Sequence, residues 1–458
     1  MPITPHPETR DLKPLPVPDL NNTLEGYQHA LEAVLDGPDL ERAHEITADF
    51  AEEQGPRLDD ALRTRAAQRE SQGTNWLSDE WYSAYLTTRG PLPLTTNVGF
   101  QLSLPTGATG LDRVVERIQR AIAVHLQSAS GDLPENVDAR GNRITQNQWF
   151  VYAGGLRHPR PDEDEIIAST PGTANREIGI FLNGRLFALK VTDDSGAPIS
   201  AASLRAALEA VLERGIEPGA EPGAEPGART GELDFNAPSL LGSGALGELL
   251  PELLLRGENE AVYDRLRDML FTADLIDVHG RSQETDAKRI ERLTFLPRGA
   301  WVYKPLSYQF SLADDWAAVH VEHSCQDGAT LVTAVTRMQN ATIPAGVDLA
   351  VGPEELAWDF GEDLSERIAA GVADVAQQAG ELHTEILAVP HDLPADLPFK
   401  FSRDASAQLT MTIAQQLTYG RVRAVYEAVD MREYRAGRTE CLRAATPEAV
   451  SFARKLVA

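Results

Sequence analysis

The feature that most constrains this sequence is a strand-like segment that ends in a histidine. Between Trp316 and Glu322 the residues alternate as they do in a strand with two distinct faces. One face is predicted to carry Ala317, Val319, Val321 and His323, and the other Trp316, Ala318, His320 and Glu322. A histidine that leaves an apolar strand and enters a turn can act as a general base near neutral pH. Asp327, four residues further on, would fix its tautomer or steady the local backbone.

The histidine has alternative interpretations. A lone histidine in apolar surroundings is more often a core residue bonded to a backbone carbonyl, so its function depends on the rest of the chain. A second enzymatic interpretation takes Cys325 as a nucleophile and His323 as its partner, although cysteine more often fills space in a core. A metal site built from His320, His323, Cys325 and Asp327 is disfavoured, because the alternation sends the two histidines to opposite faces.

Length and charge exclude several classes of function. A chain of 458 residues exceeds what one hydrophobic core usually supports, which predicts two domains. The formal charge of −27 opposes extended contact with nucleic acid or an anionic membrane. No apolar run reaches the roughly 18 residues needed to cross a bilayer. Residues 1–20 lack a targeting pattern, and Cys325 and Cys441 are too few for a disulfide framework, so a cytoplasmic location is expected.

Helical and strand-like patterns succeed one another along the chain. Residues 24–35 show helical spacing, and two apolar segments flank Asn183–Gly184, which is a strong hairpin signal. Helical patterns at 201–213 and 260–275 alternate with strands, which favours a mixed sheet covered by helices. The threefold Glu-Pro-Gly-Ala repeat at 217–228 is typical of a solvated loop.

The C-terminal part shows further elements. Apolar residues from Leu364 to Leu382 mark a long amphipathic helix. Ser402 is placed to cap another helix, which Gly420 ends. Residues 424–429 are predicted to form a strand.

Several separated motifs point together to one family. Those near the N-terminus are Leu15–Leu20, Asn75-Trp76-Leu77-Ser78, Trp81 and Ala84-Tyr85-Leu86. Those in the centre are Gln148-Trp149-Phe150, Arg157 to Glu165, Trp301-Val302-Tyr303-Lys304, and His323 with Asp327 in an EHxxx[ED]G pattern. The last ones are Ser402-Arg403-Asp404-Ala405, Gln408, Tyr426-Glu427 and Gly437-Arg438-Thr439-Glu440. In this order the motifs resemble those of the choline/carnitine O-acyltransferase family.

The resemblance implies a fold and a reaction. The fold would be α/β, with two chloramphenicol-acetyltransferase-like domains whose mixed sheets are flanked by helices and an active-site tunnel at their interface. The first domain is expected to be discontinuous and incomplete, over residues 1–95 and 355–458, and the second to span residues 96–354 with His323. The reaction would pass an acyl group between acyl-CoA and carnitine or choline. Acyl-CoA is then a co-substrate, and no permanently bound cofactor is expected.

The resemblance also implies roles for single residues. His323 would deprotonate the carnitine hydroxyl, with Asp327 as its catalytic neighbour. Tyr426 and Thr439 would bind the carnitine carboxylate, and Thr439 favours carnitine because choline-preferring members usually carry an apolar residue there. The residues expected to meet CoA are Lys400, Asp404 and Glu427. Purely structural roles stay open for Tyr426 in a sheet, Thr439 in a turn and Asp404 at a helix terminus.

The sequence departs from the family pattern at several places. Tyr303 stands where the family usually has aspartate, and Ala428 stands where it has a serine that helps to bind carnitine. Residues 393–398 lack the pair of lysines that meets CoA, and residues 237–242 replace a TSxxRxxW element. The chain reaches Ala458 without the family's serine-rich motif. These departures give a second hypothesis, an impaired or non-catalytic binding protein, with a separate C-terminal fragment as an expected partner.

Overall fold

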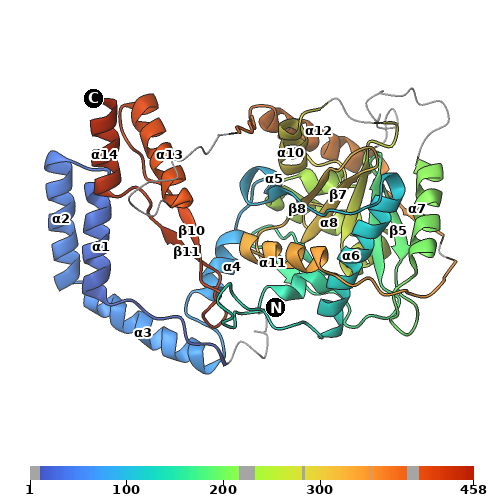
Figure 1. Cartoon of the computed structure of the whole chain (residues 1–458), viewed down its shortest axis with the longest axis horizontal. Coiled ribbons are helices and arrows are strands. Elements are labelled where there is room, and N and C mark those ends of the chain that lie inside the picture. The colour runs from blue at the N-terminus through green and yellow to red at the C-terminus, as the bar shows by residue number, and fades with distance from the viewer. Residues whose placement is uncertain (1–10, 216–232, 281–283, 351, 389–401) are drawn as a thin grey trace. The chain divides into compact units, whose positions relative to one another are not determined.

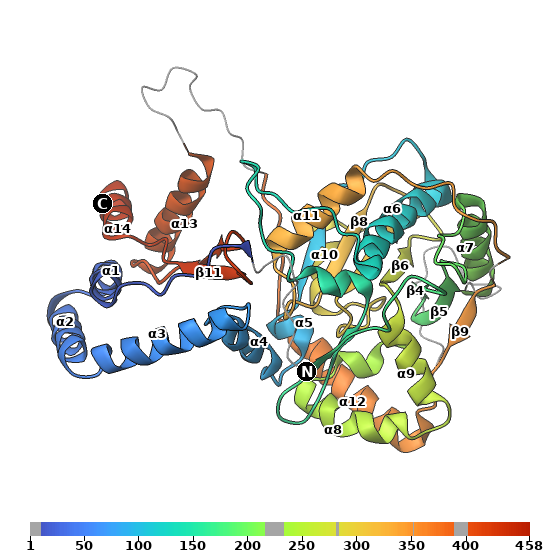
Figure 2. The same ribbon diagram turned by 90° about the horizontal axis from the view of Figure 1, so that it is seen from below.

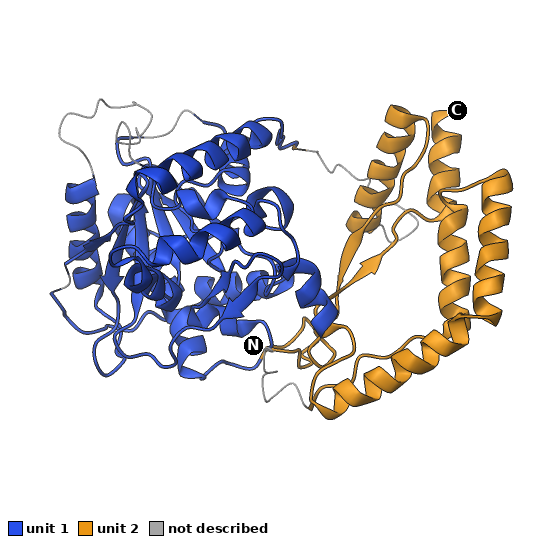
Figure 3. Cartoon of the chain, turned by 180° about the vertical axis from the view of Figure 1, so that it is seen from behind, with its two compact units in different colours: residues 1–3, 79–135, 147–387 blue, residues 4–78, 136–146, 388–458 orange. Residues whose placement is uncertain are grey.

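The chain folds into two compact units. Figure 1 shows the computed structural model, which describes residues 11–215, 233–280, 284–350, 352–388 and 402–458. Figure 3 shows the larger unit, which contains Asp79–Glu135 and Asn147–Leu387, and the smaller unit, which contains Thr4–Ser78, Asn136–Gln146 and Ala388–Ala458. Residues 79–95 and 355–387, expected in the first domain, thus lie in the larger unit. The repeat at 217–228 and Lys400 lie outside the described residues.

A seven-stranded mixed sheet forms the centre of the larger unit, in the order β1-β8-β7-β6-β4-β5-β9. Strand β6 pairs parallel with β4 and β7, and the remaining neighbours pair antiparallel. The strands are β1 (Val98–Gln101), β4 (Glu177–Leu182), β5 (Arg185–Lys190), β6 (Thr272–Ile276), β7 (Leu306–Ser311), β8 (Ala317–Val321) and β9 (Glu354–Leu356). A short separate sheet pairs β2 (Leu156–His158) with β3 (Glu165–Ile167). The predicted mixed α/β class is confirmed.

Helices cover both faces of this sheet, as Figure 2 shows. One face packs against α6 (Gly110–Ser130), α7 (Ala201–Gly215) and α11 (Gly328–Gln339). The other packs against α8 (Ser243–Leu254), α9 (Asn259–Asp268) and α12 (Gly361–Ala379). The remaining helices of this unit are α4 (Ser78–Leu86), α5 (Leu92–Thr95), α10 (Asp286–Phe295), η2 (Trp149–Ala153) and η3 (Ala237–Leu240). The central sheet is therefore buried on both sides.

Strand β8 has the two faces that the sequence predicts. Val319 and Val321 belong to the apolar cluster that includes residues of α6 and α11. Ala318 instead packs with Trp316 and with Leu293 of α10. The alternation therefore separates two different sets of neighbours, because successive side chains of a strand point to opposite faces.

The hairpin between β4 and β5 is also as predicted. Asn183 and Gly184 have φ angles of 52° and 77°, the left-handed pair that a two-residue hairpin turn requires. A Cβ atom at Gly184 would lie 2.0 Å from the Oδ1 atom of Asp234. Both the turn geometry and the close approach of Asp234 therefore demand glycine at this position.

The smaller unit is mainly helical in its described part. Its elements are α1 (Leu20–Glu32), α2 (Gly37–Glu52), α3 (Gly55–Ser71), α13 (Arg403–Tyr419), α14 (Pro447–Val457), β10 (Glu427–Asp430) and β11 (Thr439–Leu442). Ser402 caps α13 by accepting a hydrogen bond from the Ala405 amide, and Gly420 ends the helix with φ 67°, as predicted. The strand expected over residues 424–429 begins only at residue 427 and ends at residue 430, and Val425 packs against an apolar cluster ahead of it. Within the described ranges, no helix combines the length and the apolar character that are needed to cross a membrane.

His320 of β8 is buried in its neutral form. Its Nδ1 atom lies 2.9 Å from the Leu293 carbonyl oxygen, and its Nε2 atom 2.9 Å from the side-chain nitrogen of Asn97. A carbonyl only accepts and an amide nitrogen only donates, so the proton of the neutral ring sits on Nδ1. Burial lowers the pKa of His320 to about 4, below the value of about 6.5 for an exposed histidine.

We expect His320→Gln to make the fold less sensitive to acid. Below about pH 6.5 the unfolded chain takes up a proton at residue 320, whereas the folded chain does so only near pH 4. As pH falls through this window, the histidine therefore lowers the free energy of unfolding by up to about 1.4 kcal/mol per pH unit. Asp274, whose pKa burial raises to about 6, acts in the opposite direction but equally in both proteins. Urea unfolding at several pH values measures the two slopes, and equal slopes would contradict the expectation.

Candidate active site

His323 lies in the turn between β8 and α11. Its side chain is 25% exposed, and its Nδ1 atom lies 2.7 Å from the backbone carbonyl oxygen of Gln326. Because a carbonyl can only accept, Nδ1 donates the hydrogen bond and carries the proton of the neutral ring. The lone pair then belongs to Nε2. The backbone of the turn thus selects the tautomer in which Nε2 can accept a proton.

Asp327 steadies the turn from the other side. Its Oδ1 atom is 3.9 Å from the Nδ1 atom of His323, which is too long for a hydrogen bond. Its Oδ2 atom instead accepts from the Gln148 side-chain amide at 2.6 Å, and its backbone amide donates to the Gln148 side-chain oxygen at 2.9 Å. Of the two roles considered for Asp327, this geometry favours support of the local backbone.

A buried arginine connects the turn to the neighbouring elements. Arg157 of β2 donates from Nη1 to the Glu322 carboxylate at 3.0 Å and from Nη2 to the Tyr85 carbonyl at 2.8 Å. The Glu322 carboxylate also accepts from the amide and the hydroxyl of Ser324, at 3.2 and 2.6 Å. The Tyr85 ring lies against the imidazole of His323, with 5.3 Å between ring centroids. One guanidinium therefore binds Glu322 and Tyr85 directly, and Ser324 through the Glu322 carboxylate.

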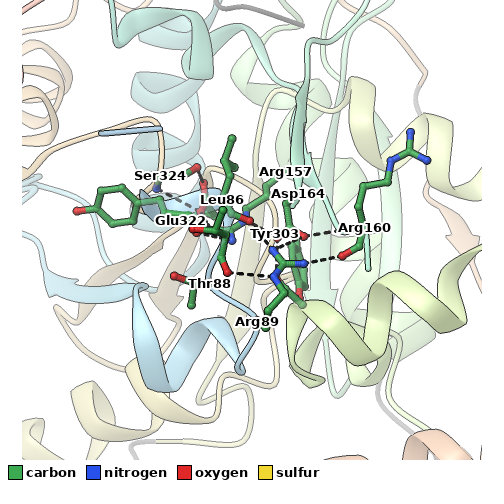
Figure 4. A network of polar contacts seen from close by, with 12 residues as sticks. Leu86, Thr88, Arg89, Arg157, Arg160, Asp164, Tyr303, Glu322 and Ser324 are labelled. Carbon is green, nitrogen blue, oxygen red and sulfur yellow. Dashed lines mark hydrogen bonds and ion pairs between the residues drawn. The ribbon is translucent and has the colours of Figure 1, made fainter. Parts of the chain in front are cut away.

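The network extends to a second arginine, as Figure 4 shows. Asp164 accepts from the Nε atom of Arg157 at 2.7 Å and from Arg89 at 2.9 Å. It also accepts from the Ser243 hydroxyl at 2.7 Å, and that hydroxyl lies 3.1 Å from the hydroxyl of Tyr303. Burial raises the pKa of Tyr303, so this residue stays neutral. The network pairs the cations of Arg89 and Arg157 with the carboxylates of Asp164 and Glu322.

Cys325 lies in the hydrophobic core. Its side chain is buried in the apolar cluster that also contains Val321 and Leu331, and its sulfur lies 3.4 Å from the Ser324 hydroxyl. This position fits a small space-filling residue. Among the described residues no group of three or more His, Cys, Asp or Glu side chains is arranged to hold a metal ion.

The other predicted site residues belong to the smaller unit. Tyr426 is exposed and directly precedes β10, and Thr439 begins β11, where it pairs with Asp430. The Glu427 carboxylate accepts from the Gln408 side chain of α13 at 2.6 Å. Asp404 is exposed in the first turn of α13. The structure thus brings His323 and Asp327 together in one unit, and places Tyr426, Glu427 and Thr439 on one hairpin of the other.

Gln148, Arg157 and Glu322 contribute to the network around His323, although the sequence alone indicates no role for them. Gln148 and Arg157 stand inside motifs that resemble those of the family, but their partners Asp327 and Glu322 follow 179 and 165 residues later. A hydrogen bond over such a separation leaves no periodic signal in the sequence. The one local sign was the presence of an arginine and a glutamate next to apolar strands, where an unpaired charge is not tolerated.

The sequence places this chain among enzymes that transfer acyl groups. Residues 15–458 match the choline/carnitine O-acyltransferase family, and the chain belongs to that family. The resemblance seen in the separated motifs is therefore confirmed.

The matched relatives are distant in sequence but similar over most of this chain. Carnitine O-acetyltransferase of Columba livia is 24% identical over 96% of this chain and 71% of its own length. Mitochondrial carnitine O-palmitoyltransferase 2 of Bos taurus is 23% identical, over 94% of this chain and 69% of its own length. Among solved structures, a chloramphenicol acetyltransferase matches with a TM-score of 0.26 and 11% identity, over 58% of this chain and 95% of that chain. A score at that level does not establish a common fold.

We expect Gln148→Ala to destabilise the larger unit. The substitution removes a hydrogen-bond donor from the buried carboxylate of Asp327 and an acceptor from its amide, so the free energy of unfolding should fall by about 1–3 kcal/mol. Chemical denaturation measures this change. Gln339→Ala is a matched control, since Gln339 is an exposed residue at the end of α11 whose side-chain amide donates to the Ser103 carbonyl, and the substitution should change stability by less than about 0.5 kcal/mol. Equal effects of the two substitutions would contradict the structural role of Gln148.

Proposed function

We propose that this protein transfers an acyl group between acyl-CoA and the hydroxyl of carnitine, or of a related quaternary-amine alcohol, with His323 as the general base. The observation that carries the proposal is the hydrogen bond from the Nδ1 atom of His323 to the Gln326 carbonyl, 2.7 Å long, in a chain of this family. That bond leaves the lone pair on Nε2. The acetyl- and palmitoyltransferases among the relatives, both named for carnitine, support the choice of acceptor.

The reaction needs a base because an alcohol is a weak nucleophile. The Nε2 atom of His323 takes the hydroxyl proton as the hydroxyl oxygen attacks the thioester carbonyl. The carbon–sulfur bond then breaks, and the imidazolium returns the proton to the CoA sulfur. In the reverse direction the imidazole takes the proton from the thiol. The acyl group passes directly between the substrates, and holding both in place supplies the entropic part of the rate.

Binding of the substrates is assigned to the smaller unit. In the proposal Tyr426 and Thr439 donate hydrogen bonds to the carnitine carboxylate, while Asp404, Glu427 and Lys400 contact CoA. Support comes from the motifs that these residues share with the family and from the joint position of Tyr426, Glu427 and Thr439 on the β10–β11 hairpin. The exposure of the Tyr426 side chain leaves its hydroxyl accessible to a ligand.

We expect His323→Ala to lower kcat by about 10²- to 10⁴-fold, the contribution that a positioned general base commonly makes. Release of the CoA thiol from acetyl-CoA or palmitoyl-CoA in the presence of carnitine measures the rate. Cys325→Ser should keep most of the activity, because Cys325 fills space in the core. If Cys325→Ser abolishes turnover, the thiol is the nucleophile and the proposal is wrong.

We expect Tyr426→Phe and Thr439→Val each to raise the KM for carnitine by about tenfold, because each removes one hydrogen bond to a charged group. The KM for acyl-CoA should change little. Tyr419→Phe is a matched control, since Tyr419 is an exposed tyrosine at the end of α13 and has no proposed ligand. Steady-state kinetics with each substrate varied in turn measures these constants, and an unchanged KM for carnitine in both variants would remove the two residues from the carnitine site.

The departures from the family pattern favour one further candidate, a protein that binds the substrates without transferring the acyl group. The observation behind it is the absence of lysine from residues 393–398, where the family has a pair that meets CoA. Calorimetric titration with acyl-CoA and carnitine separates the two functions. Binding of both ligands without any thiol release by the wild-type protein would support the binding protein, and release that depends on His323 would exclude it.

A further inference from the structure

Arg157 is connected through the Glu322 carboxylate to the residues on both sides of His323. Its Nη1 atom donates to the Glu322 carboxylate at 3.0 Å, and Glu322 directly precedes the histidine. The same carboxylate accepts from the amide and hydroxyl of Ser324, which directly follows it. The Nη2 atom donates to the Tyr85 carbonyl at 2.8 Å, and the Tyr85 ring lies against the imidazole. One guanidinium therefore holds the turn and the aromatic ring in a fixed mutual position.

We propose that Arg157 is a positioning residue, which fixes the imidazole of His323 for proton transfer by holding Glu322 and Tyr85. The inference rests on the proposed function, in which His323 is the base. Arg157 acts through its neighbours and contacts no reacting atom. The planar guanidinium suits this role, because its five N–H groups point in fixed directions and meet several acceptors at once.

Burial makes the arrangement rigid. The side chains of Arg157 and Asp164 are 0% exposed, and that of Glu322 is 2% exposed. The guanidinium cannot swing away without leaving two carboxylates unpaired in a site that excludes water, which is strongly unfavourable. Charge-assisted hydrogen bonds of this kind are also short and directional. The turn that carries His323 therefore cannot shift independently of α4, which carries Tyr85, or of β2, which carries Arg157.

The matching of charges decides which variant tests the role. Arg157→Met alone leaves Asp164 and Glu322 with one cation fewer and is expected to unfold more readily. Arg157→Met/Glu322→Gln removes one positive and one negative charge, so that Arg89 still balances Asp164. We expect the double variant to fold and to lose about 10²-fold in kcat, while the KM values stay within about twofold, because a misplaced base slows the chemical step without weakening binding.

A buried ion pair elsewhere in the same unit provides the matched control. Arg289 is 3% exposed and pairs with Asp277 and Asp314, each at 3.0 Å. Asp314 lies between β7 and β8, at the end of β8 opposite to His323. Arg289→Met/Asp277→Asn should lower the thermal midpoint by a similar amount and leave kcat within about twofold of wild type. A fall in kcat equal to that of the Arg157 double variant would show that the loss reflects stability alone and would overturn the proposal.

The imidazole tautomer gives a readout that does not depend on activity. Long-range ¹H–¹⁵N spectra of histidine-labelled protein should show His323 of the wild type protonated at Nδ1, with the signal assigned by its loss in His323→Ala. In the Arg157 double variant we expect the two neutral tautomers to mix. A folded double variant with the wild-type tautomer, whatever its kcat, would overturn the proposal.

The activity assay and the tautomer spectrum test the proposed function and the role of Arg157 separately. If His323→Ala retains full activity, the proposed function fails, yet the tautomer spectrum still decides whether Arg157 positions the ring. If the double variant does not fold, Ser324→Ala tests the same connection, because it removes the 2.6 Å hydrogen bond to Glu322 without changing any charge. We expect the same direction of change in kcat and tautomer for Ser324→Ala, and an unchanged spectrum would count against the proposal.

Discussion

The pairing of the Arg157 guanidinium with two carboxylates is the interaction on which the candidate site depends. Burial alone would lower the pKa of Arg157, but Glu322 and Asp164 outweigh it, and the pKa is raised. The cation is therefore retained where water is excluded. Because a buried ion must meet its partners with good geometry, the partners lose their freedom as well. The segments that carry Tyr85, Asp164 and Glu322 are thereby fixed to one point near His323.

The neutral side chain of Tyr303 fits the same balance of charges. Its hydroxyl lies 3.1 Å from that of Ser243, which donates to Asp164, so residue 303 borders the network. The family usually has aspartate at this position, and an aspartate here would set three carboxylates against Arg89 and Arg157. A neutral tyrosine keeps the charges matched and still supplies a hydroxyl. The departure at residue 303 is thus compatible with an intact support for His323.

The sequence predicted what depends on neighbours along the chain. The Asn183–Gly184 turn and the cap at Ser402 were predictable because each is a local backbone requirement. The turn that carries His323 was likewise predictable from the alternation of β8. The hydrogen bonds that hold this turn could not be predicted, since Gln148 and Asp327 lie 179 residues apart. Motif resemblance marked both residues without saying that they meet.

The position of α12 in the fold also depends on contacts between residues that are distant in the sequence. Its amphipathic pattern was predicted, and the structure confirms a helix over Gly361–Ala379. A periodic pattern shows that one face is buried but does not show what buries it. Leu364 and Ile368 belong to the same apolar cluster as Leu241 and Leu250 of the larger unit, so the helix forms part of the layer on one face of the sheet that contains β8. The resemblance implied that residues 355–387 share a domain with residues 1–95, whereas the apolar cluster that residues 364 and 368 join includes residues more than a hundred positions earlier.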